Sequence, residues 1–304
     1  MRRVSFWKQI RAAPVMHLAS IPDNPNLARL IGHAYLEAGH TDVAVALLTH
    51  ATSGSQAPLA YFDLCTQAWD AGRTEDAFAH CKAGGISAQV WIDRAVQFVA
   101  SGNQEEAIRA YRFAVDLEPE WHLPRQRLAG LLQEQARYDD IIQLLESWIE
   151  RYPDASPDPY HQLGNAYWKL GQSGRALQFL LEGNRRFPNE TTIYLFLAYV
   201  YDDTGDLDAA AQWYDRILEK NPNSHTYILV KRGKIAETLK DPETAIDLYR
   251  RATERAPDSL DAWLGLARSF EMAGLLGEAI NAYERVLELN PNNEFSRDHL
   301  EQLR

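Results

Sequence analysis

The residue types that most often carry chemistry are present in this sequence, but their spacing does not form a reactive site. The nine histidines are scattered, and none falls in an H-E-x-x-H sequence or in a cysteine and histidine arrangement that binds zinc. The run from Leu170 to Gly174 is similar to a nucleophile elbow, but it lacks the second glycine at the required spacing. No phosphate-binding glycine loop or dinucleotide fingerprint occurs. The sequence therefore predicts no enzyme activity, no catalytic residues and no cofactor.

Four aspartates crowd around Gly205 and suggest a calcium loop: Asp202, Asp203, Asp206 and Asp208. The ligand spacing and the terminal glutamate of an EF-hand loop are missing. We therefore interpret this cluster as a solvated turn that also caps a helix, and we predict no metal site.

The elements that would position any functional side chain repeat along the chain. Apolar, small and glycine residues in one fixed order occur three times: Tyr160, Leu163, Gly164, Tyr167 and Gly171; Tyr194, Leu197, Ala198, Tyr201 and Gly205; Trp263, Leu266, Ala267, Phe270 and Gly274. Prolines recur with a spacing of 34 or 35 residues: Pro119, Pro153, Pro188, Pro222, Pro257 and Pro291. Between these markers lie two stretches with helical periodicity, so each period predicts one pair of helices.

This pattern resembles the tetratricopeptide repeat, a helix-turn-helix unit of about 34 residues. The resemblance implies an all-α fold, a right-handed superhelical α-solenoid of about eight repeats with short terminal caps. The predicted repeats are 25–57, 58–87, 88–121, 122–156, 157–190, 191–225, 226–259 and 260–293. Residues 1–24 form a separate N-terminal segment, and residues 294–304 are expected to form a C-terminal capping helix.

The second repeat departs most from the pattern, because its second helix is expected to end early at Gly84 and Gly85. We expect this shortening to alter the stacking between the second and third repeats. Elsewhere, one slot of the first helix holds a small residue such as Gly164, and it is expected to face a small residue of the second helix such as Ala176. The glycine would then let the two helices approach closely.

Turn residues agree with these helix pairs. Six polar side chains stand just before a helical run, where an oxygen can accept from a free helix N–H: Thr41, Thr74, Asn103, Ser173, Asp206 and Asp241. Pro242 follows Asp241 at the first helical position, where its missing N–H costs little.

The two cysteines, Cys65 and Cys81, occupy facing slots of the second repeat, so their side chains are expected to be neighbours. We expect two buried thiols that serve as small hydrophobic residues in a reducing cytoplasm. The alternative is a redox pair that mild oxidation would join.

The family resemblance implies that a partner binds in the concave groove lined by the first helices. In the second and third repeats, the groove positions are mostly apolar, which predicts an exposed interaction patch: Leu59, Phe62, Trp69, Ile92, Val96 and Val99. In the fifth to eighth repeats they are mixed and suit an extended peptide: His161, Asn165, Trp168, Lys169, Tyr199, Lys234 and Arg268. The alternative is a solvated inner face without a partner.

The net charge of −11 and the isoelectric point near 5.3 argue against binding to nucleic acid or to an anionic membrane. No apolar run has the length of a membrane span, so we predict no membrane insertion. The first 22 residues contain Lys8 and Arg11 within their apolar part and make a poor secretory signal. A cytoplasmic location is expected, with a periplasmic or membrane-complex location left open.

Both ends of the chain offer covering segments. Near the N-terminus, Phe6, Trp7 and Ile10 can form an apolar side that caps the first repeat or covers the apolar patch of the second and third repeats. At the C-terminus, we expect Phe295, Leu300 and Leu303 to cover the last repeat.

Taken together, these patterns predict a non-enzymatic scaffold that binds a protein or peptide segment and supports assembly of a complex. A second hypothesis is self-association into a homo-oligomeric scaffold. A third is an accessory protein of an enzyme, or of an envelope-assembly or secretion complex. The sequence does not identify the partner.

Overall fold

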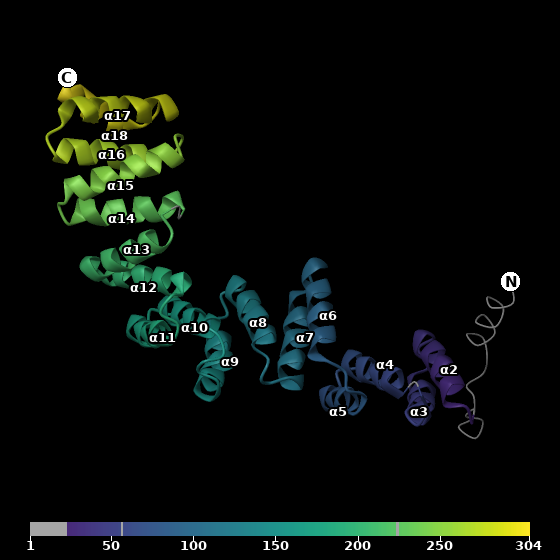
Figure 1. Cartoon of the computed structure of the whole chain (residues 1–304). Helices are drawn as coiled ribbons and strands as arrows, with labels where there is room; N and C mark the ends of the chain where they lie inside the picture. The colour runs from purple at the N-terminus through teal and green to yellow at the C-terminus, as the bar shows by residue number, and fades with distance from the viewer. Residues whose placement is uncertain (1–22, 56, 223–224) are drawn as a thin grey trace. The chain divides into compact units, whose positions relative to one another are not determined.

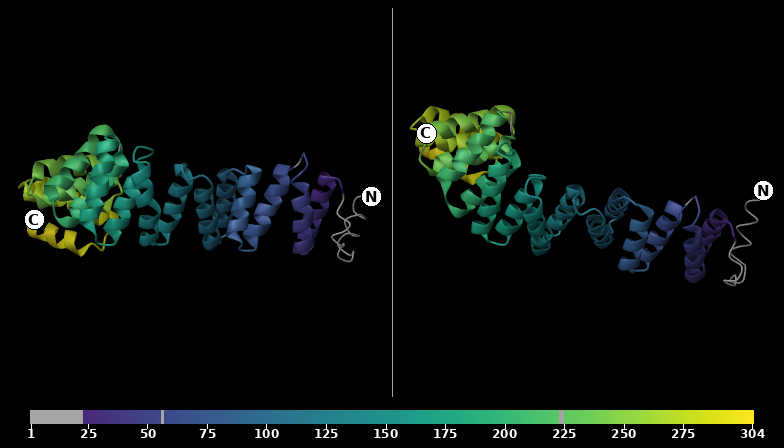
Figure 2. Two further views of the ribbon diagram at one scale, coloured as in Figure 1. Left: turned by 90° about the horizontal axis from the view of Figure 1, so that it is seen from below. Right: turned by 60° about the horizontal axis from the view of Figure 1, so that its bottom comes forward.

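The computed structural model describes residues 23–55, 57–222 and 225–304, and every regular element in them is an α-helix. The chain forms two compact units, Met1–Gln135 and Ala136–Arg304, named here the N-terminal unit and the C-terminal unit. In each unit, consecutive helices pair through short turns, and the pairs stack side by side (Figures 1 and 2). The predicted all-α solenoid is confirmed.

The N-terminal unit contains seven described helices: α2 (Pro25–Glu37), α3 (Thr41–Ala51), α4 (Ala57–Asp70), α5 (Thr74–Gly84), α6 (Ala88–Ala100), α7 (Gln104–Leu117) and α8 (His122–Glu134). The described helices of the C-terminal unit are α9 (Tyr138–Arg151), α10 (Asp158–Lys169), α11 (Ser173–Arg186), α12 (Thr191–Thr204), α13 (Leu207–Lys220), α14 (Thr226–Thr238), α15 (Pro242–Arg255), α16 (Leu260–Met272), α17 (Leu276–Leu289) and α18 (Glu294–Leu303). The division between the two units falls inside the predicted fourth repeat.

Helix pairing depends on a close contact between the small slot of a first helix and a residue sixteen positions later. A Cβ atom on Gly164 would lie 2.4 Å from Cγ of Leu180. A Cβ atom on Gly233 would lie 2.9 Å from Cζ of Tyr249. The large residue one helical turn after Ala176 therefore fills the space that the missing side chain of Gly164 leaves.

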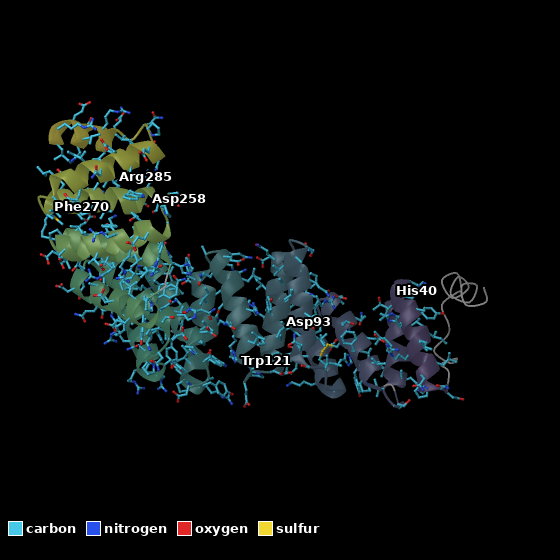
Figure 3. The ribbon with its side chains drawn as sticks, turned by 45° about the horizontal axis from the view of Figure 1, so that its top comes forward. His40, Asp93, Trp121, Asp258, Phe270 and Arg285 are labelled. Atoms are coloured by element: carbon cyan, nitrogen blue, oxygen red, sulfur yellow. A yellow bond between two sulfur atoms is a disulfide. The ribbon has the colours of Figure 1, made fainter. Side chains whose placement is uncertain are left out.

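The two cysteines occupy this same pair of slots. Cys65 of α4 and Cys81 of α5 form a disulfide across a Cα–Cα distance of 5.3 Å, and both are fully buried (Figure 3). The expectation of two free thiols is therefore wrong. The slot pair holds the two backbones at a separation that a disulfide can span, and the sequence had already indicated that the two side chains are neighbours.

Two of the six predicted helix caps form. Asp206 accepts a hydrogen bond from the backbone N–H of Ala209, and Asp241 accepts one from Thr244, with Pro242 at the first helical position. The other four predicted caps are wrong. Asn103 stands at the cap position but makes no capping bond. The remaining three are the first residues of their helices, one position after the cap: Thr41, Thr74 and Ser173.

At the end of the C-terminal unit, α18 packs on the core of the last helix pair through Leu300 and Leu303. Phe295 was also expected to cover this core, but it remains 43% exposed while it contacts the rings of Tyr283 and His299. The predictions for Phe6, Trp7 and Ile10 lie outside the described residues.

The glycine contact generates a stability prediction. Gly164→Ala should lower the free energy of unfolding by about 1–3 kcal/mol, the usual cost of overpacking a core, because the new methyl group collides with Leu180. Thermal unfolding followed by circular dichroism measures this. Gly130→Ala in α8 is the matched control, because a Cβ there meets nothing within 4 Å. That control should be neutral or stabilise the chain by up to about 1 kcal/mol, and equal effects of the two changes would contradict the packing described.

The disulfide between Cys65 and Cys81 leads to a second prediction about stability. Reduction should lower the free energy of unfolding by about 3 kcal/mol, because a loop of this length restricts the unfolded chain by roughly that amount. Thermal unfolding with and without dithiothreitol measures the change. The double variant Cys65→Ala, Cys81→Ala should unfold at one temperature under both conditions. The wild-type protein should also be unfolded and refolded with the reductant, so that the reductant reaches the buried bond. A midpoint of thermal unfolding that still does not change would show that the bond does not stabilise the fold.

Candidate functional site

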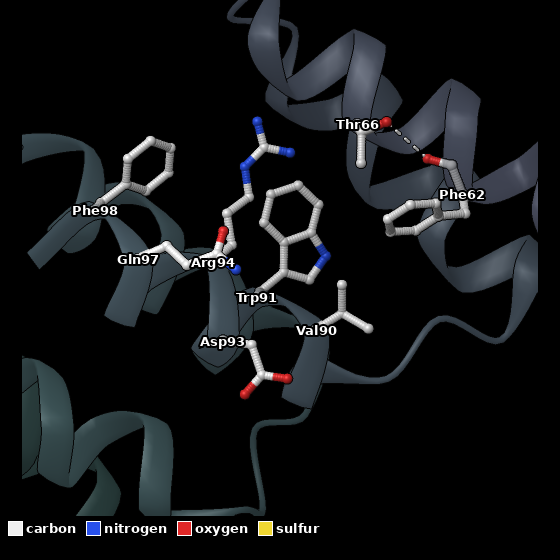
Figure 4. Close-up of a pocket in the computed structure, with 8 residues that line it drawn as sticks. All are labelled: Phe62, Thr66, Val90, Trp91, Asp93, Arg94, Gln97 and Phe98. Atoms are coloured by element: carbon white, nitrogen blue, oxygen red, sulfur yellow. Dashed lines mark hydrogen bonds between the residues drawn. The ribbon is translucent and has the colours of Figure 1, made fainter. Parts of the chain in front are cut away.

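The N-terminal unit contains a pocket of about 480 Å³ between the first helices α4 and α6. We name it the α4–α6 pocket. Figure 4 shows its lining, with two residues from α4 and the rest from α6: Phe62, Thr66, Val90, Trp91, Asp93, Arg94, Gln97 and Phe98. The Thr66 hydroxyl donates to the carbonyl oxygen of Phe62 at 3.0 Å, which leaves its lone pairs free to accept. The pocket thus combines an apolar floor with a small number of polar groups, the usual composition of a recognition site.

Two arginines enclose the indole ring of Trp69 beside this pocket. The guanidinium carbon of Arg94 lies 4.7 Å from the ring centroid, and that of Arg109 lies 3.6 Å from it. Arg109 also donates to the carbonyl oxygen of Trp69 at 2.7 Å, and Arg94 pairs with the carboxylate of Asp70. Arg94 thus joins α6 to α4 at the edge of the pocket, and Arg109 joins α7 to α4.

The predicted apolar patch is only partly exposed. Leu59, Val96 and Val99 are exposed, and Phe62 is half-buried and lines the pocket. Trp69 and Ile92, however, are only 2% and 5% exposed, so the expectation that they face solvent is wrong.

The reasons for this burial differ. The two arginines cover Trp69, and Ile92 belongs to the buried stripe of α6, which follows helical spacing: Ala88, Trp91, Ile92 and Ala95. The sequence analysis missed Val90, Arg94 and Phe98 as pocket residues. The repeat pattern assigned Phe98 to a packing slot, and the interruption at Gly84 and Gly85 was the signal that this part of the stack is open.

In the C-terminal unit, side-chain rings from three successive first helices meet on one face. We name the set His161, Phe196, Trp168, Tyr199 and Tyr227 the aromatic face. The rings of His161 and Phe196 stack with 5.7 Å between centroids, Trp168 stacks on Tyr199 at 5.8 Å, and Tyr199 meets Tyr227 at 6.4 Å. Tyr227 is 48% exposed. The structure therefore brings together three of the predicted groove residues and adds Phe196 and Tyr227.

Two lysines and an aspartate border the aromatic face. The Nζ atom of Lys169 lies 4.2 Å from the ring centroid of Trp168, and that of Lys231 lies 5.8 Å from the ring centroid of Tyr227. The predicted groove residue Lys234 is exposed. The indole Nε1–H of Trp168 donates to Asp203 at 3.1 Å, which fixes the orientation of the ring. Asn165 does not belong to this surface, because it is 4% exposed; α10 is packed against α9, α11 and α12, which buries most of its circumference. The expectation of an accessible Asn165 is wrong.

Arg268 is committed to a charge network inside the C-terminal unit. Its Nε and Nη2 atoms donate to the two carboxylate oxygens of Glu237 at 3.1 and 2.9 Å, and Tyr249 donates to the same carboxylate at 2.9 Å. The hydrogen bonds that Arg268 donates to the Glu237 carboxylate raise the pKa of Arg268, and burial raises the pKa of the Tyr249 hydroxyl, so both groups stay protonated donors. Arg268 thus joins two neighbouring helix pairs.

The aspartates around Gly205 serve separate structural roles. Asp203 accepts from Trp168, Asp202 lies 3.6 Å from Nζ of Lys231, and Asp206 caps α13. Among the residues that the structure describes, no three histidine, cysteine, aspartate or glutamate side chains gather as metal ligands. No helix in the described ranges has both the length and the apolar composition needed to cross a bilayer.

Comparison with known families identifies the class of protein. A tetratricopeptide repeat model matches residues 28–221, and a second model of the same description matches residues 230–294. Because the first match alone covers more than half of the sequence, the chain belongs to the tetratricopeptide repeat family.

Relatives in sequence match parts of longer proteins. The uncharacterised protein ycf37 of Cyanophora paradoxa is 34% identical over 110 residues, which make up 35% of this chain and 64% of that protein. Subunit CDC16 of the anaphase-promoting complex of Saccharomyces cerevisiae is 25% identical over 242 residues, 74% of this chain and 28% of that subunit. The chain therefore spans less than two thirds of the length of these relatives.

Solved structures show the same fold. YrrB, described as a tetratricopeptide repeat protein with an unusual peptide-binding site, superposes with a TM-score of 0.56 and 16% identity over 63% of this chain and 98% of its own. PilF of Pseudomonas aeruginosa has a TM-score of 0.51 and 21% identity over 70% of this chain and 98% of its own. At these identities the likeness concerns the fold alone.

The Glu237 network generates a testable difference between two ion pairs. Glu237→Gln should lower the free energy of unfolding by about 1–2 kcal/mol, because it weakens charge-assisted hydrogen bonds from Arg268 and Tyr249. Chemical unfolding followed by circular dichroism measures the change. Glu288→Gln removes the exposed pair with Arg285 and should cost less than about 0.5 kcal/mol. Equal costs for the two variants would show that Glu237 does not join the helix pairs.

Proposed function

We propose that this chain is a non-enzymatic scaffold that binds a protein or peptide segment, and that the aromatic face of the C-terminal unit is the binding surface. The observation that carries the proposal is the meeting of rings from α10, α12 and α14 on one face, with Tyr227 half exposed. Tyrosine and tryptophan contribute strongly to binding because they supply a large apolar area together with a hydrogen-bonding group.

The charges around the aromatic face suggest the chemistry of the bound segment. Lys169 is exposed beside the ring of Trp168. The other charged groups have partners within the chain, because Lys231 pairs with Asp202, Trp168 donates to Asp203, and Arg268 pairs with Glu237. A segment with an aromatic or large apolar residue next to an acidic one would match the exposed rings and the available positive charge. We therefore propose an extended acidic-aromatic peptide segment as the class of ligand.

The descriptions of similar proteins support a binding role. YrrB is described as having a peptide-binding site, and CDC16 is a subunit of the anaphase-promoting complex. Both descriptions concern association with other polypeptides, and both proteins share the repeat with this chain. Supporting assembly of a protein complex is therefore the role that we propose for this chain.

The disulfide bears on where such a complex would form. Thiols are kept reduced in most cytoplasms, and disulfides persist in oxidising compartments. The Cys65–Cys81 bond therefore favours an oxidising compartment, such as the periplasm, over the cytoplasmic location expected from the sequence.

A peptide library displayed on phage and selected against the full chain tests the proposed function. We expect enriched peptides that contain an aromatic residue beside acidic ones. Tyr227→Ala should weaken their binding about tenfold, a typical effect for an aromatic contact worth 1.4 kcal/mol. Phe295→Ala in α18, an aromatic residue of similar exposure outside the aromatic face, should leave binding unchanged. Enriched peptides that respond equally to both variants would contradict the assignment of this face.

A further inference from the structure

The α4–α6 pocket opens where the helix stack is irregular. α5 ends at Gly84, and Gly85 follows in the left-handed region with φ of 62°. This second helix has 11 residues, whereas α7 of the next pair has 14. The contact between these two repeats includes the two arginines around Trp69 and the Arg94–Asp70 pair, and the α4–α6 pocket lies beside them.

The lining of the pocket defines what could fill it. Its floor is made of aromatic and aliphatic groups, Phe62, Trp91, Phe98 and the 37%-exposed Val90. A carboxylate of the lining, Asp93, is exposed, and the one cation of the lining, Arg94, already pairs with Asp70. An occupant therefore needs a large apolar or aromatic side chain, flanked by positive charge.

The described part of the N-terminal unit and the segment before it differ in charge. Residues 23–135 contain fourteen acidic and eight basic residues, so the N-terminal unit beyond residue 22 is negatively charged. Residues 1–22 contain four basic residues and no acidic one, and they hold two adjacent aromatic residues, Phe6 and Trp7. These 22 residues lie outside the described part of the chain, but their composition is complementary to the pocket in both charge and apolar content.

The segment also joins the described chain close to the pocket. The start of α2 lies beside the loop before α4, because the Asn26 side chain and the Ser55 hydroxyl are 3.4 Å apart. Phe62 follows the start of α4 by five residues, which is about 7.5 Å along the helix. A connection of eleven residues between Arg11 and Asp23 spans about 18 Å on average, which is enough to reach Phe62.

We infer that the α4–α6 pocket is a docking site for residues 6–11 of the same chain, with Phe6 or Trp7 on the apolar floor and Lys8 and Arg11 toward the carboxylate of Asp93. Tethering raises the effective concentration of the segment to about the millimolar range, so even a weak contact would be occupied. This docking is independent of the aromatic face proposed as the partner site, which lies in the C-terminal unit.

Photochemical crosslinking in the full chain tests this inference. Trp7 is replaced with the photoreactive aromatic residue benzoylphenylalanine, and the products are mapped by mass spectrometry in an equal mixture of nitrogen-15-labelled and unlabelled protein. We expect crosslinks to the pocket lining of α4 and α6, within one chain only. Val90→Asp should abolish them, because it places a charge on the apolar wall without disturbing a buried residue. Leu239→Asp, a change of similar exposure in the C-terminal unit, should leave the yield unchanged.

Each other outcome would overturn the inference. Crosslinks confined to α2 and α3 would show that the segment covers the first helix pair. Products that join labelled and unlabelled chains would show that it binds a second copy. A yield that Val90→Asp does not lower, with unfolding temperatures equal to wild type, would show that the segment does not use the pocket.

Discussion

The close contact between the two helices of a pair is the constraint on which the remaining structure depends. In three described pairs, a glycine of the first helix leaves room for a large side chain sixteen residues later: Gly32 with Leu48, Gly164 with Leu180 and Gly233 with Tyr249. The ring of Tyr249 also fills the space above Gly265 of the following pair, where a Cβ would come within 2.3 Å. One side chain thus sets the spacing both within a pair and between pairs. In α4 and α5 the disulfide occupies the same two slots and performs the same task covalently.

The surfaces available for binding follow from this arrangement. Most large apolar residues of the repeats are buried in contacts between helices. The residues available for recognition are therefore those of the first helices that do not take part in this packing. Regular stacking in the C-terminal unit produces the aromatic face, because residues at related positions of successive helices line up. In the N-terminal unit, aromatic side chains of α4 and α6 line a pocket next to the helix that ends early at Gly84. The C-terminal unit therefore presents an aromatic face, and the N-terminal unit presents a pocket.

The sequence was sufficient for the period, the family and the all-α solenoid, because proline and glycine spacing report directly on turns and helix contacts. It also indicated that Cys65 and Cys81 are neighbours, but not that they are bonded, since bonding depends on the redox conditions as well as on distance. The exposure of Trp69 and Asn165 was not predictable. Trp69 is covered by two arginines, one of them from α7, and Asn165 by the helices around α10, and neither contact has a signature in the repeat pattern.

Two carboxylates of the C-terminal unit each contact a side chain from a later helix of the chain. Glu237 of α14 receives its guanidinium from α16, and Glu271 of α16 is met by His299 of α18 at 3.0 Å. Each of these two carboxylates also accepts from a tyrosine of its own helix pair, Tyr249 for Glu237 and Tyr283 for Glu271. One carboxylate therefore bonds both to its own pair and to an element later in the chain. During synthesis, such a group would make its bond within the pair first and gain the second partner when the following element folds, and α18 supplies the last of these partners.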